Sequence, residues 1–196
     1  MLRRLRVGTD GWVDGIRRRP SENFDARPPG VPVDLLVLHN ISLPPGHFGG
    51  GCIERLFCAA LDARAHPFLE QLANVRVSAH FLIERDGCIT QFVSCRERAW
   101  HAGASSFGGR AACNDFSVGV ELEGTDFTAF EVAQYAALAV LTTALRAALP
   151  LRAVRGHSQI SPGRKTDPGP MFDWQRFAEA ARLPADWLPE RSGAGD

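Results

Sequence analysis

The segment VDLLVLHN, residues 33–40, constrains the fold more than any other part of the chain. Its apolar run from Val33 to Leu38 is interrupted only by Asp34, and Leu35 to Leu38 form a continuous rather than alternating stretch of aliphatic and β-branched residues. A strand of this kind needs apolar cover on both faces, as the central strands of layered α/β sheets have. We therefore expect a buried central strand here, with His39 at its C-terminal end.

Four further segments have the patterning of strands. Asp86-Gly87 is typical of the tight turn of a hairpin and separates the first two of these segments. In FSVGVELEG, apolar residues alternate at Val118, Val120 and Leu122. The four strands are expected at 75–84, 88–93, 116–124 and 152–156.

Helical spacing of apolar residues predicts three helices between and after these strands. Thr128 followed by Glu131 matches a capping box, and Pro150 would end the helix that starts there. The other two helices are expected over 52–61 and from about Asp173 through Ala180.

This order of elements, without an internal repeat or a long linker, predicts one α/β domain with a central mixed β-sheet flanked by helices. We place the domain over 1–196, with its core at about 11–183 and a flexible tail at 190–196.

Composition excludes several classes of function. The 196 residues carry 22 basic and 22 acidic side chains, so the net charge gives no reason to expect a nucleic-acid partner. No apolar stretch approaches the roughly 18 to 20 residues that span a bilayer, and the N-terminus lacks the apolar run of a secretory signal. The 5 cysteines include no C-x-x-C pair and fit a reducing compartment. We therefore expect a cytoplasmic protein without membrane insertion, and we favour a monomer.

Polar residues stand where the apolar strands end. His39, Glu121 and His157 all occupy such positions, which are common places for active groups in layered α/β folds. With Asp167, the two imidazoles form a ligand set that leaves a fourth zinc position free for water, as catalytic zinc sites do. For each His taken alone, a hydrogen-bonded core or surface residue is the favoured interpretation, and His80, inside a strand, is expected to be buried support.

The loop GHSQISPGRKTDPGP, residues 156–170, gathers His157, Lys165 and Asp167 within eleven positions. Its Pro and Gly residues disfavour regular structure and predict a loop fixed in one shape. A polar surface turn is the simpler interpretation of such a segment. The alternative is a loop that presents a metal ligand and a cation together.

Long motifs along the chain decide between these alternatives. LLVLHNISLPPGHFGG, RVSAHFLIERDG, ERAWHAG, CNDFSVGVELEGTD and GHSQISPGRKTDPGP resemble the AmpD-type N-acetylmuramoyl-L-alanine amidases of the zinc amidase and peptidoglycan-recognition superfamily. The resemblance runs from about Gly11 to Phe177. It implies a zinc site at the strand ends, a muropeptide substrate, and hydrolysis of the amide between (1,6-anhydro-)N-acetylmuramic acid and L-Ala of the stem peptide in cytoplasmic peptidoglycan recycling.

The resemblance also implies roles for individual residues. His39, His157 and Asp167 would hold zinc, Glu121 would be the general base, and Lys165 would face the carbonyl oxygen that becomes negative during the reaction. Spacing alone does not separate Glu121 from Glu123, because residues two apart on a strand share a face. The family motif selects Glu121.

Five further residues are candidates for substrate contacts or for support of the zinc site. An amide suits hydrogen bonds to sugar or peptide groups, and paired Arg donors suit carboxylates. Trp100 and His101 would line the sugar pocket or support the metal ligands, although core packing explains Trp100 equally well. The candidates are Asn40, Arg76, Trp100, His101 and Arg110.

Two rival functions remain at this stage. The same superfamily contains noncatalytic peptidoglycan-binding modules, which commonly lose a metal ligand or a catalytic group. This chain keeps the three ligand candidates and both catalytic candidates, namely His39, His157, Asp167, Glu121 and Lys165. A zinc peptidase acting on ordinary peptides would cleave stem peptides that lack the sugar. Zinc content and product analysis distinguish the three functions.

Overall fold

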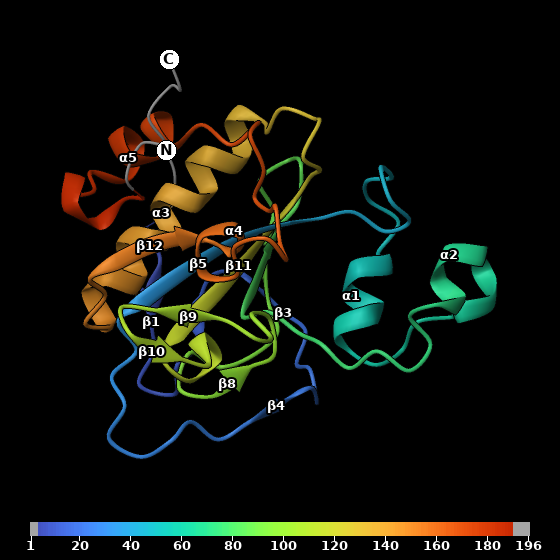
Figure 1. Cartoon of the computed structure of the whole chain (residues 1–196), viewed down its shortest axis with the longest axis horizontal. Coiled ribbons are helices and arrows are strands. Elements are labelled where there is room, and N and C mark those ends of the chain that lie inside the picture. Colours follow the sequence, from blue (N-terminus) through green and yellow to red (C-terminus); the bar gives the residue numbers. More distant parts are fainter. Residues whose placement is uncertain (1–3, 190–196) are drawn as a thin grey trace.

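The computed structural model describes residues 4–189 and contains a six-stranded mixed sheet with the strand order β12-β5-β11-β6-β7-β3 (Figure 1). Neighbouring strands run parallel except β6 and β7, which form an antiparallel hairpin. This arrangement confirms the predicted single α/β domain. The strands are β12 (Ala153–Gly156), β5 (Leu35–Ile41), β11 (Ser117–Glu123), β6 (Phe81–Ile83), β7 (Ile89–Gln91) and β3 (Arg17–Arg18).

Three two-stranded antiparallel ribbons surround the main sheet. They pair β1 (Arg6–Val7) with β2 (Val13–Asp14), β4 (Phe24–Asp25) with β8 (Arg98–Ala99), and β9 (Ser106–Phe107) with β10 (Arg110–Ala111).

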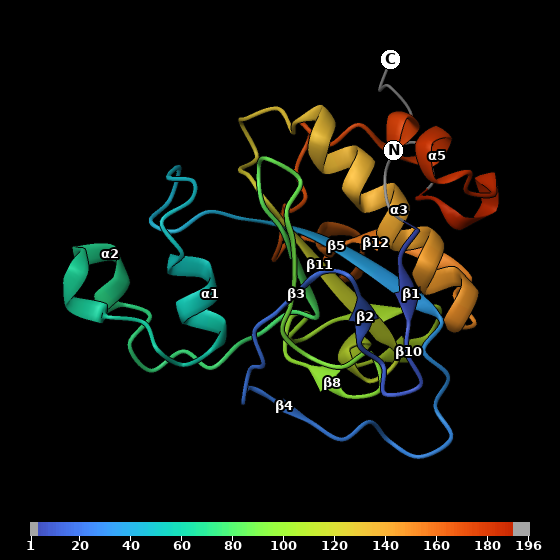
Figure 2. The same cartoon turned by 180° about the vertical axis from the view of Figure 1, so that it is seen from behind.

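The helices lie on different sides of the sheet. Figures 1 and 2 show α3 and α5 together over one face, while α1 and α2 stand beside the sheet at the opposite end of the molecule. The α-helices are α1 (Cys52–Phe57), α2 (Pro67–Glu70), α3 (Val132–Ala148), α4 (His157–Ile160) and α5 (Trp174–Ala181). Short 3₁₀ helices are η1 (Ala63–Ala65), η2 (Cys113–Asp115) and η3 (Ala185–Trp187).

The two central strands divide their side chains between two apolar layers. Residues at alternate positions of β5 and β11 pack against α3 and α5, and the set comprises Leu36, Leu38, Val118, Val120 and Leu122. On the other face, Leu35 and Val37 pack against Ala102, Phe116 and Ile160. The continuous apolar run of β5 is therefore covered on both faces, as its sequence predicts.

A third apolar cluster holds α1 against the sheet. Ile53, Leu56 and Phe57 of this helix pack with residues that include Leu82 and Phe92. Arg17 of β3 forms an ion pair with Glu54 of α1, so charge reinforces this contact.

Several element boundaries differ from the sequence-based prediction. The helix expected over 52–61 ends at Phe57, and the strand expected over 75–84 is limited to Phe81–Ile83. The capping-box prediction at Thr128 and Glu131 was wrong by one helical turn, because Glu131 is the N-cap. Its backbone N–H donates to Oε1 of Gln134 at 3.0 Å, whereas Thr128 pairs with Thr125 in a turn.

Other local predictions are confirmed. Asp86-Gly87 forms the β6–β7 turn, in which Gly87 has a φ of 85° and Asp86 accepts from the Cys88 N–H at 2.8 Å. Asp173 caps α5 by accepting from the Arg176 N–H. The predicted tail 190–196 lies outside the described residues.

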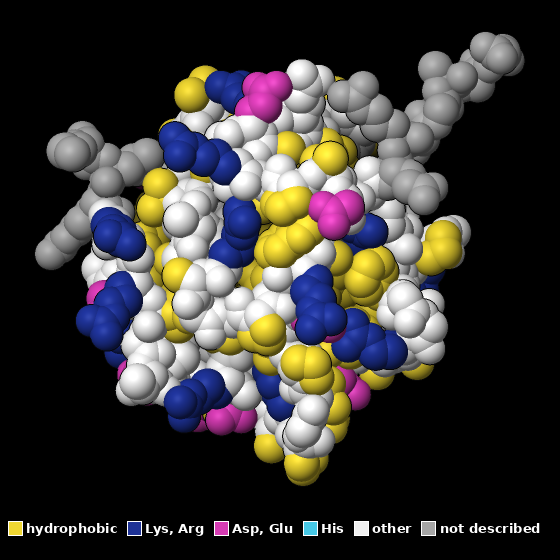
Figure 3. Space-filling view, turned by 90° about the vertical axis from the view of Figure 1, so that its left-hand side faces the viewer, with side chains coloured by type: hydrophobic (Ala, Val, Ile, Leu, Met, Phe, Trp, Pro, Cys, Tyr) yellow, Lys and Arg dark blue, Asp and Glu magenta, His cyan; other side chains and the backbone are white. Residues whose placement is uncertain are grey.

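The molecular surface is mixed in character. Figure 3 shows basic side chains spread over one face among hydrophobic and acidic ones. Within residues 4–189, none of the helices has both the length and the apolar character needed to cross a bilayer.

Candidate active site

His39 and Glu121 are brought together by strand register. In the parallel pair β5–β11, Glu121 lies directly opposite His39. Both residues face away from α3, because their neighbours Leu38, Val120 and Leu122 point into the α3 layer. His39 was predicted at the C-terminal end of its strand, and it lies two residues before the last residue of β5, Ile41. Its ring is thereby fixed by the sheet rather than by a loop.

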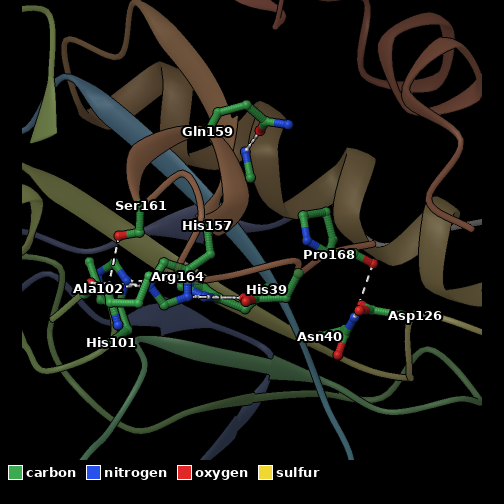
Figure 4. A network of polar contacts seen from close by, with 12 residues as sticks. His39, Asn40, His101, Ala102, Asp126, His157, Gln159, Ser161, Arg164 and Pro168 are labelled. Carbon is green, nitrogen blue, oxygen red and sulfur yellow. Dashed lines mark hydrogen bonds and ion pairs between the residues drawn. The ribbon is translucent and has the colours of Figure 1, made fainter. Parts of the chain in front are cut away.

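The neighbouring strand β12 brings His157 to the same place. Gly156 pairs with Leu38, and His157 then begins α4 beside His39. The N–H of Gly156 donates to Oε1 of Gln159 at 2.5 Å, which closes the first turn of the short helix (Figure 4). A side chain at Gly156 would collide with Pro168, so this position needs glycine for close contact between strand and loop.

The loop after α4 returns Asp167 to the two histidines. The N–H of Ser158 donates to the carbonyl of Asp167 at 2.9 Å and anchors this return. Nδ1 of His39 lies 3.0 Å from Nδ1 of His157, and these nitrogens lie 2.9 and 3.1 Å from Oδ2 of Asp167. Residues 118 and 128 positions apart thus converge into one group of potential metal ligands.

The donor set fits a metal ion. Nε2 of His157 lies 3.1 Å from the carbonyl oxygen of Ala102, which can only accept, and 3.4 Å from Nη2 of Arg164, which can only donate. The shorter contact favours a hydrogen on Nε2, which leaves a free lone pair on Nδ1 when the ring is neutral. Nε2 of His39 likewise points away, toward Nδ1 of His101 at 3.0 Å. Two imidazole nitrogens and a carboxylate oxygen therefore face a common centre, as in catalytic zinc sites with three protein ligands.

Electrostatics favour the ligand forms of these groups. Burial lowers the pKa of His39, more than its contact with Asp167 raises it, and so favours the neutral ring. Burial alone would raise the pKa of Asp167, but hydrogen bonds from His157 and His39 hold it well below its usual range. Neutral histidines and an ionised carboxylate are the forms that bind metal.

Glu121 differs from Glu123 in how its oxygens are satisfied. Glu123 accepts from the N–H groups of Gly49 at 2.5 Å and Arg85 at 3.2 Å. Oε2 of Glu121 is buried and has no hydrogen-bond partner among residues 4–189. Burial raises the pKa of Glu121 well above its usual value, Asp167 adds to the effect, and Lys165 opposes it. A buried, unpaired carboxyl with a raised pKa is suited to take up and release a proton.

A pocket of about 500 Å³ lies beside this cluster. Lys165 is exposed at the pocket, and its backbone N–H donates to the carbonyl of Ser161 at 3.1 Å. The lining residues are Asn40, Ser42, Pro45, Gly46, Thr125, Asp126, Phe127, Thr128, Arg164, Lys165, Thr166 and Asp167.

Asn40, predicted to contact substrate, joins the two walls of this pocket. Its Nδ2 donates to Oδ1 of Asp126 at 2.7 Å and to the carbonyl of Pro168 at 3.1 Å (Figure 4). Asp126 also packs directly on Gly169. The amide nitrogen thus supports the pocket wall.

The sequence analysis missed three residues that shape the pocket: Asp126, Phe127 and Arg164. Phe127 is 89% exposed at the pocket rim. Arg164 donates to the carbonyls of Ala102 and Ala104 and to Oγ of Ser161 (Figure 4). Asp126 belongs to the quoted motif CNDFSVGVELEGTD, which was a signal for it. Arg164 likewise belongs to the quoted motif GHSQISPGRKTDPGP, whereas neither a quoted motif nor a periodic pattern marks Phe127.

Arg76, Arg110 and Trp100, which were also predicted to contact substrate, lie in three different environments. Arg76 is exposed and donates to the carbonyls of Ala73 and Val75, and Arg110 pairs with Asp34 and covers the Phe116 ring.

Trp100 is half-buried, and its backbone pairs with Ser78. Trp100, Arg76 and Arg110 remain predicted substrate contacts, and the structure does not bring their side chains to the pocket that Lys165 lines. His80 is buried and accepts from the N–H of Gly119 at its Nδ1, beneath the site.

Fold and site together define a class of protein. An α/β domain that combines a His-His-Asp group, an unpaired buried carboxyl and an adjoining polar pocket has the components of a metal-dependent hydrolase. The comparison with known families is specific: the chain belongs to the N-acetylmuramoyl-L-alanine amidase family, whose sequence profile matches residues 29–170.

Individual relatives support the same assignment. The chain is 55% identical over 169 residues to the 1,6-anhydro-N-acetylmuramyl-L-alanine amidase AmpD of Escherichia coli K12, covering 85% of this chain and 92% of that protein. It matches the crystal structure of a Se-Met AmpD derivative with a TM-score of 0.85 and 53% identity, over 87% of this chain and 97% of the other.

A more distant match is to E. coli AmiD in complex with the substrate anhydro-N-acetylmuramic acid-L-Ala-D-γ-Glu-L-Lys. That match has a TM-score of 0.56 and 29% identity, over 90% of this chain and 65% of AmiD.

Proposed function

We propose that this protein is a zinc-dependent amidase that cleaves the bond between 1,6-anhydro-N-acetylmuramic acid and L-Ala of the stem peptide. The observation that carries the proposal is the convergence of His39, His157 and Asp167 beside the unpaired carboxyl of Glu121. High identity to a relative named for this bond supports the choice of substrate.

Three residues would hold the metal through Nδ1 of His39, Nδ1 of His157 and Oδ2 of Asp167. Zinc bound there would supply a Lewis acid for the scissile carbonyl and would lower the pKa of a water molecule to about 7. Two histidines and one carboxylate leave a coordination position for that water. No cysteine contributes, which fits an open catalytic site better than a closed structural one.

Glu121 would transfer the proton. Its position opposite His39 places it next to the ligand group, and burial raises its pKa well above the usual value, which makes it a stronger base. After accepting the proton from water, it would donate it to the amine of L-Ala as the amide bond breaks. Because Oε2 has no other partner among residues 4–189, no internal hydrogen bond has to be broken before this transfer.

Lys165 would stabilise the negative charge that develops on the carbonyl oxygen. It lies two residues before Asp167, lines the same pocket and is exposed to it. A cation held at that place contributes a few kcal/mol to transition-state binding, on the order of 2.7–4 kcal/mol for one oxyanion donor. The loop anchors at Ser158 and Ser161 fix its backbone.

The remaining parts of the proposal concern where the enzyme acts. We assign it to cytoplasmic recycling of soluble muropeptides, which is supported by the anhydro sugar in the names of its relatives. A monomer and the absence of a nucleic-acid partner remain predictions from the sequence.

Product analysis tests the proposed function. Purified, zinc-loaded protein is incubated with 1,6-anhydro-N-acetylmuramyl tripeptide, and the products are identified by mass spectrometry. We expect free tripeptide and anhydromuramic acid, abolished by a chelator and restored by zinc. The sugar-free tripeptide, included as a matched substrate, should remain intact. Bound zinc with retained but uncleaved substrate would indicate a noncatalytic recognition module instead.

A variant pair assigns the metal to its ligands. Asp167→Asn should lose both zinc and activity, because the amide supplies no charge to the site. Asp186→Asn, which changes an exposed carboxylate, should keep both. Zinc retained at full stoichiometry and affinity in Asp167→Asn would place the metal elsewhere.

A further inference from the structure

In both histidines of the ligand group, the nitrogen that faces away from the proposed metal position, Nε2, contacts the short segment formed by residues 101 and 102. Nε2 of His157 lies 3.1 Å from the carbonyl oxygen of Ala102, and Nε2 of His39 lies 3.0 Å from Nδ1 of His101 (Figure 4). Residues 101 and 102 therefore form the support behind two ligands that come from different elements, His39 from β5 and His157 from α4. A backbone carbonyl supports one ligand, and a side chain supports the other.

The segment itself is held firmly. The N–H groups of His101 and Ala102 both donate to Oδ1 of Asn114, at 3.2 and 2.8 Å. Arg164 also donates to the carbonyl of Ala102, at 3.0 Å. The backbone of His101 is thus fixed by a buried amide and its neighbour by a guanidinium.

The ring of His101 is fixed as well. Its Nε2 lies 3.2 Å from Oγ of Ser117, and it stands edge-on to His39 at a centroid distance of 5.1 Å. It packs over Gly119 of β11, where an added methyl group would overlap the ring. Ser117 and Gly119 occupy the same face of β11 as Glu121, four and two residues before it, respectively. One strand therefore positions both the carboxyl and the support of His39.

We propose that His101 is a positioning residue that accepts the Nε2–H of His39 and so fixes the tautomer whose Nδ1 binds zinc. This inference rests on the proposed function, because it assumes that the group holds a metal. If Nδ1 of His39 binds metal, the hydrogen must be on Nε2, and within residues 4–189 only Nδ1 of His101 is placed to accept it. Nε2 of His101 then carries a hydrogen and donates it to Ser117.

The same contacts permit the opposite direction in the metal-free protein. The hydroxyl of Ser117 can donate to Nε2 of His101, whose Nδ1–H then donates to His39, leaving a hydrogen on Nδ1 of His39 for Asp167. Zinc would displace that hydrogen and select the first arrangement. The tautomer of His101 should therefore report whether zinc is bound two contacts away.

Two substitutions of similar size separate the positioning role from packing. In His101→Asn, the side-chain oxygen takes roughly the place of Nδ1 and can accept from His39. In His101→Gln, the terminal group takes roughly the place of Nε2 and meets Ser117, leaving His39 without its partner. Zinc affinity is measured for both by competition with a chromogenic chelator, and chelated samples are compared by thermal unfolding.

We expect His101→Gln to bind zinc about 10- to 100-fold more weakly than the parent, as is typical for loss of an outer partner, and His101→Asn to lie within about threefold of it. Equal losses in both variants, or no loss in His101→Gln, would overturn the positioning role. If the unmodified protein itself binds no zinc, the proposed function fails and not merely this inference.

Nitrogen-15 NMR provides the second readout. In the zinc-loaded parent protein, the shifts of His101 should identify the form with hydrogen on Nε2, and chelation should change them. A hydrogen on Nδ1 of His101 with zinc bound would contradict the proposal directly. Exposed His66, observed in the same spectra, is the internal control and should not respond to zinc.

Discussion

The two faces of the β5–β11 pair are made from the same backbone but have opposite properties. Toward α3 the side chains of Leu36, Leu38 and Val120 are apolar and fully buried. On the other face, apolar cover extends over Leu35 and Val37 and is then replaced by His39. The apolar face that packs against α3 stabilises the two strands, and the stable strands hold the polar groups of the other face in place. Burying the carboxyl of Glu121 without a partner lowers the stability of the fold.

The strongest test of this division is Glu121→Gln, which removes the proposed base and keeps its shape. We expect kcat/KM to fall about 10²- to 10⁴-fold, the usual contribution of general acid–base catalysis. Zinc content should be unchanged, because Glu121 is not among the three residues of the ligand group. Steady-state kinetics and metal analysis of the same preparation check both statements. Loss of zinc in this variant would sink the assignment of Glu121 as base.

The opposite face is tested by Leu36→Ala. Leu36 is fully buried against the α3 layer, so truncation should lower the free energy of unfolding by about 2–5 kcal/mol. Well below the unfolding temperature, zinc affinity and kcat/KM should remain close to those of the parent. Denaturant unfolding and the kinetic assay measure the two effects. A variant of normal stability with impaired zinc binding would show that the two faces are not separate in function.

A third contrast concerns pH in the chelated protein. Burial raises the pKa of Glu121 well above its value of about 4.3 in an unfolded chain. Its protonated form is therefore favoured by folding, and this stabilisation is complete below about pH 4.3 and lost as pH rises through the raised pKa.

The unfolding temperature of Glu121→Gln minus that of the parent should consequently increase as pH rises from about 4.5 toward 8, because only the parent loses this stabilisation. Both proteins keep His39 and Asp167, so the contributions of these residues largely cancel in the comparison. A difference that stays constant over this range, measured by calorimetry with chelator present, would mean that Glu121 is not perturbed by burial.

Features set by neighbouring residues could be predicted from the sequence, whereas features set by contacts between distant residues could not. The apolar run of β5 and the Asp86-Gly87 turn act locally, and both were predicted correctly. The cap of α3 was misplaced because Glu131 and Gln134 form one reciprocal pair while Thr128 bonds to Thr125 instead. Gln134 also donates to the carbonyls of Ile83 and Glu123, and such long-range contacts are not visible in the local sequence pattern.

Parts of the site depend on contacts between distant loops. Family motifs identified Glu121, whereas periodicity could not distinguish it from Glu123. Only the structure shows that Glu123 is occupied by two backbone N–H groups. The roles of Ala102 and Arg164 behind His157 are even less accessible to sequence, because a carbonyl contact leaves no residue signature.

Glu123→Gln is the smallest and most discriminating test, since it makes the same chemical change two residues further along the same face. The amide keeps one acceptor but sets its NH₂ group against a backbone donor at Gly49 or Arg85. We expect a loss of about 1–3 kcal/mol in unfolding free energy, typical of an unsatisfied buried group, and kcat/KM within about threefold of the parent.

Enzyme kinetics and denaturant unfolding should be measured side by side for Glu121→Gln and Glu123→Gln. We expect opposite effects of the two substitutions on activity and stability. The first variant should lose activity without losing stability, and the second should lose stability while largely keeping activity. If Glu123→Gln instead abolished turnover with zinc in place, the base would have to be reassigned to the carboxyl that the structure shows already paired. Partnering of the oxygens would then not predict which carboxyl of β11 transfers the proton.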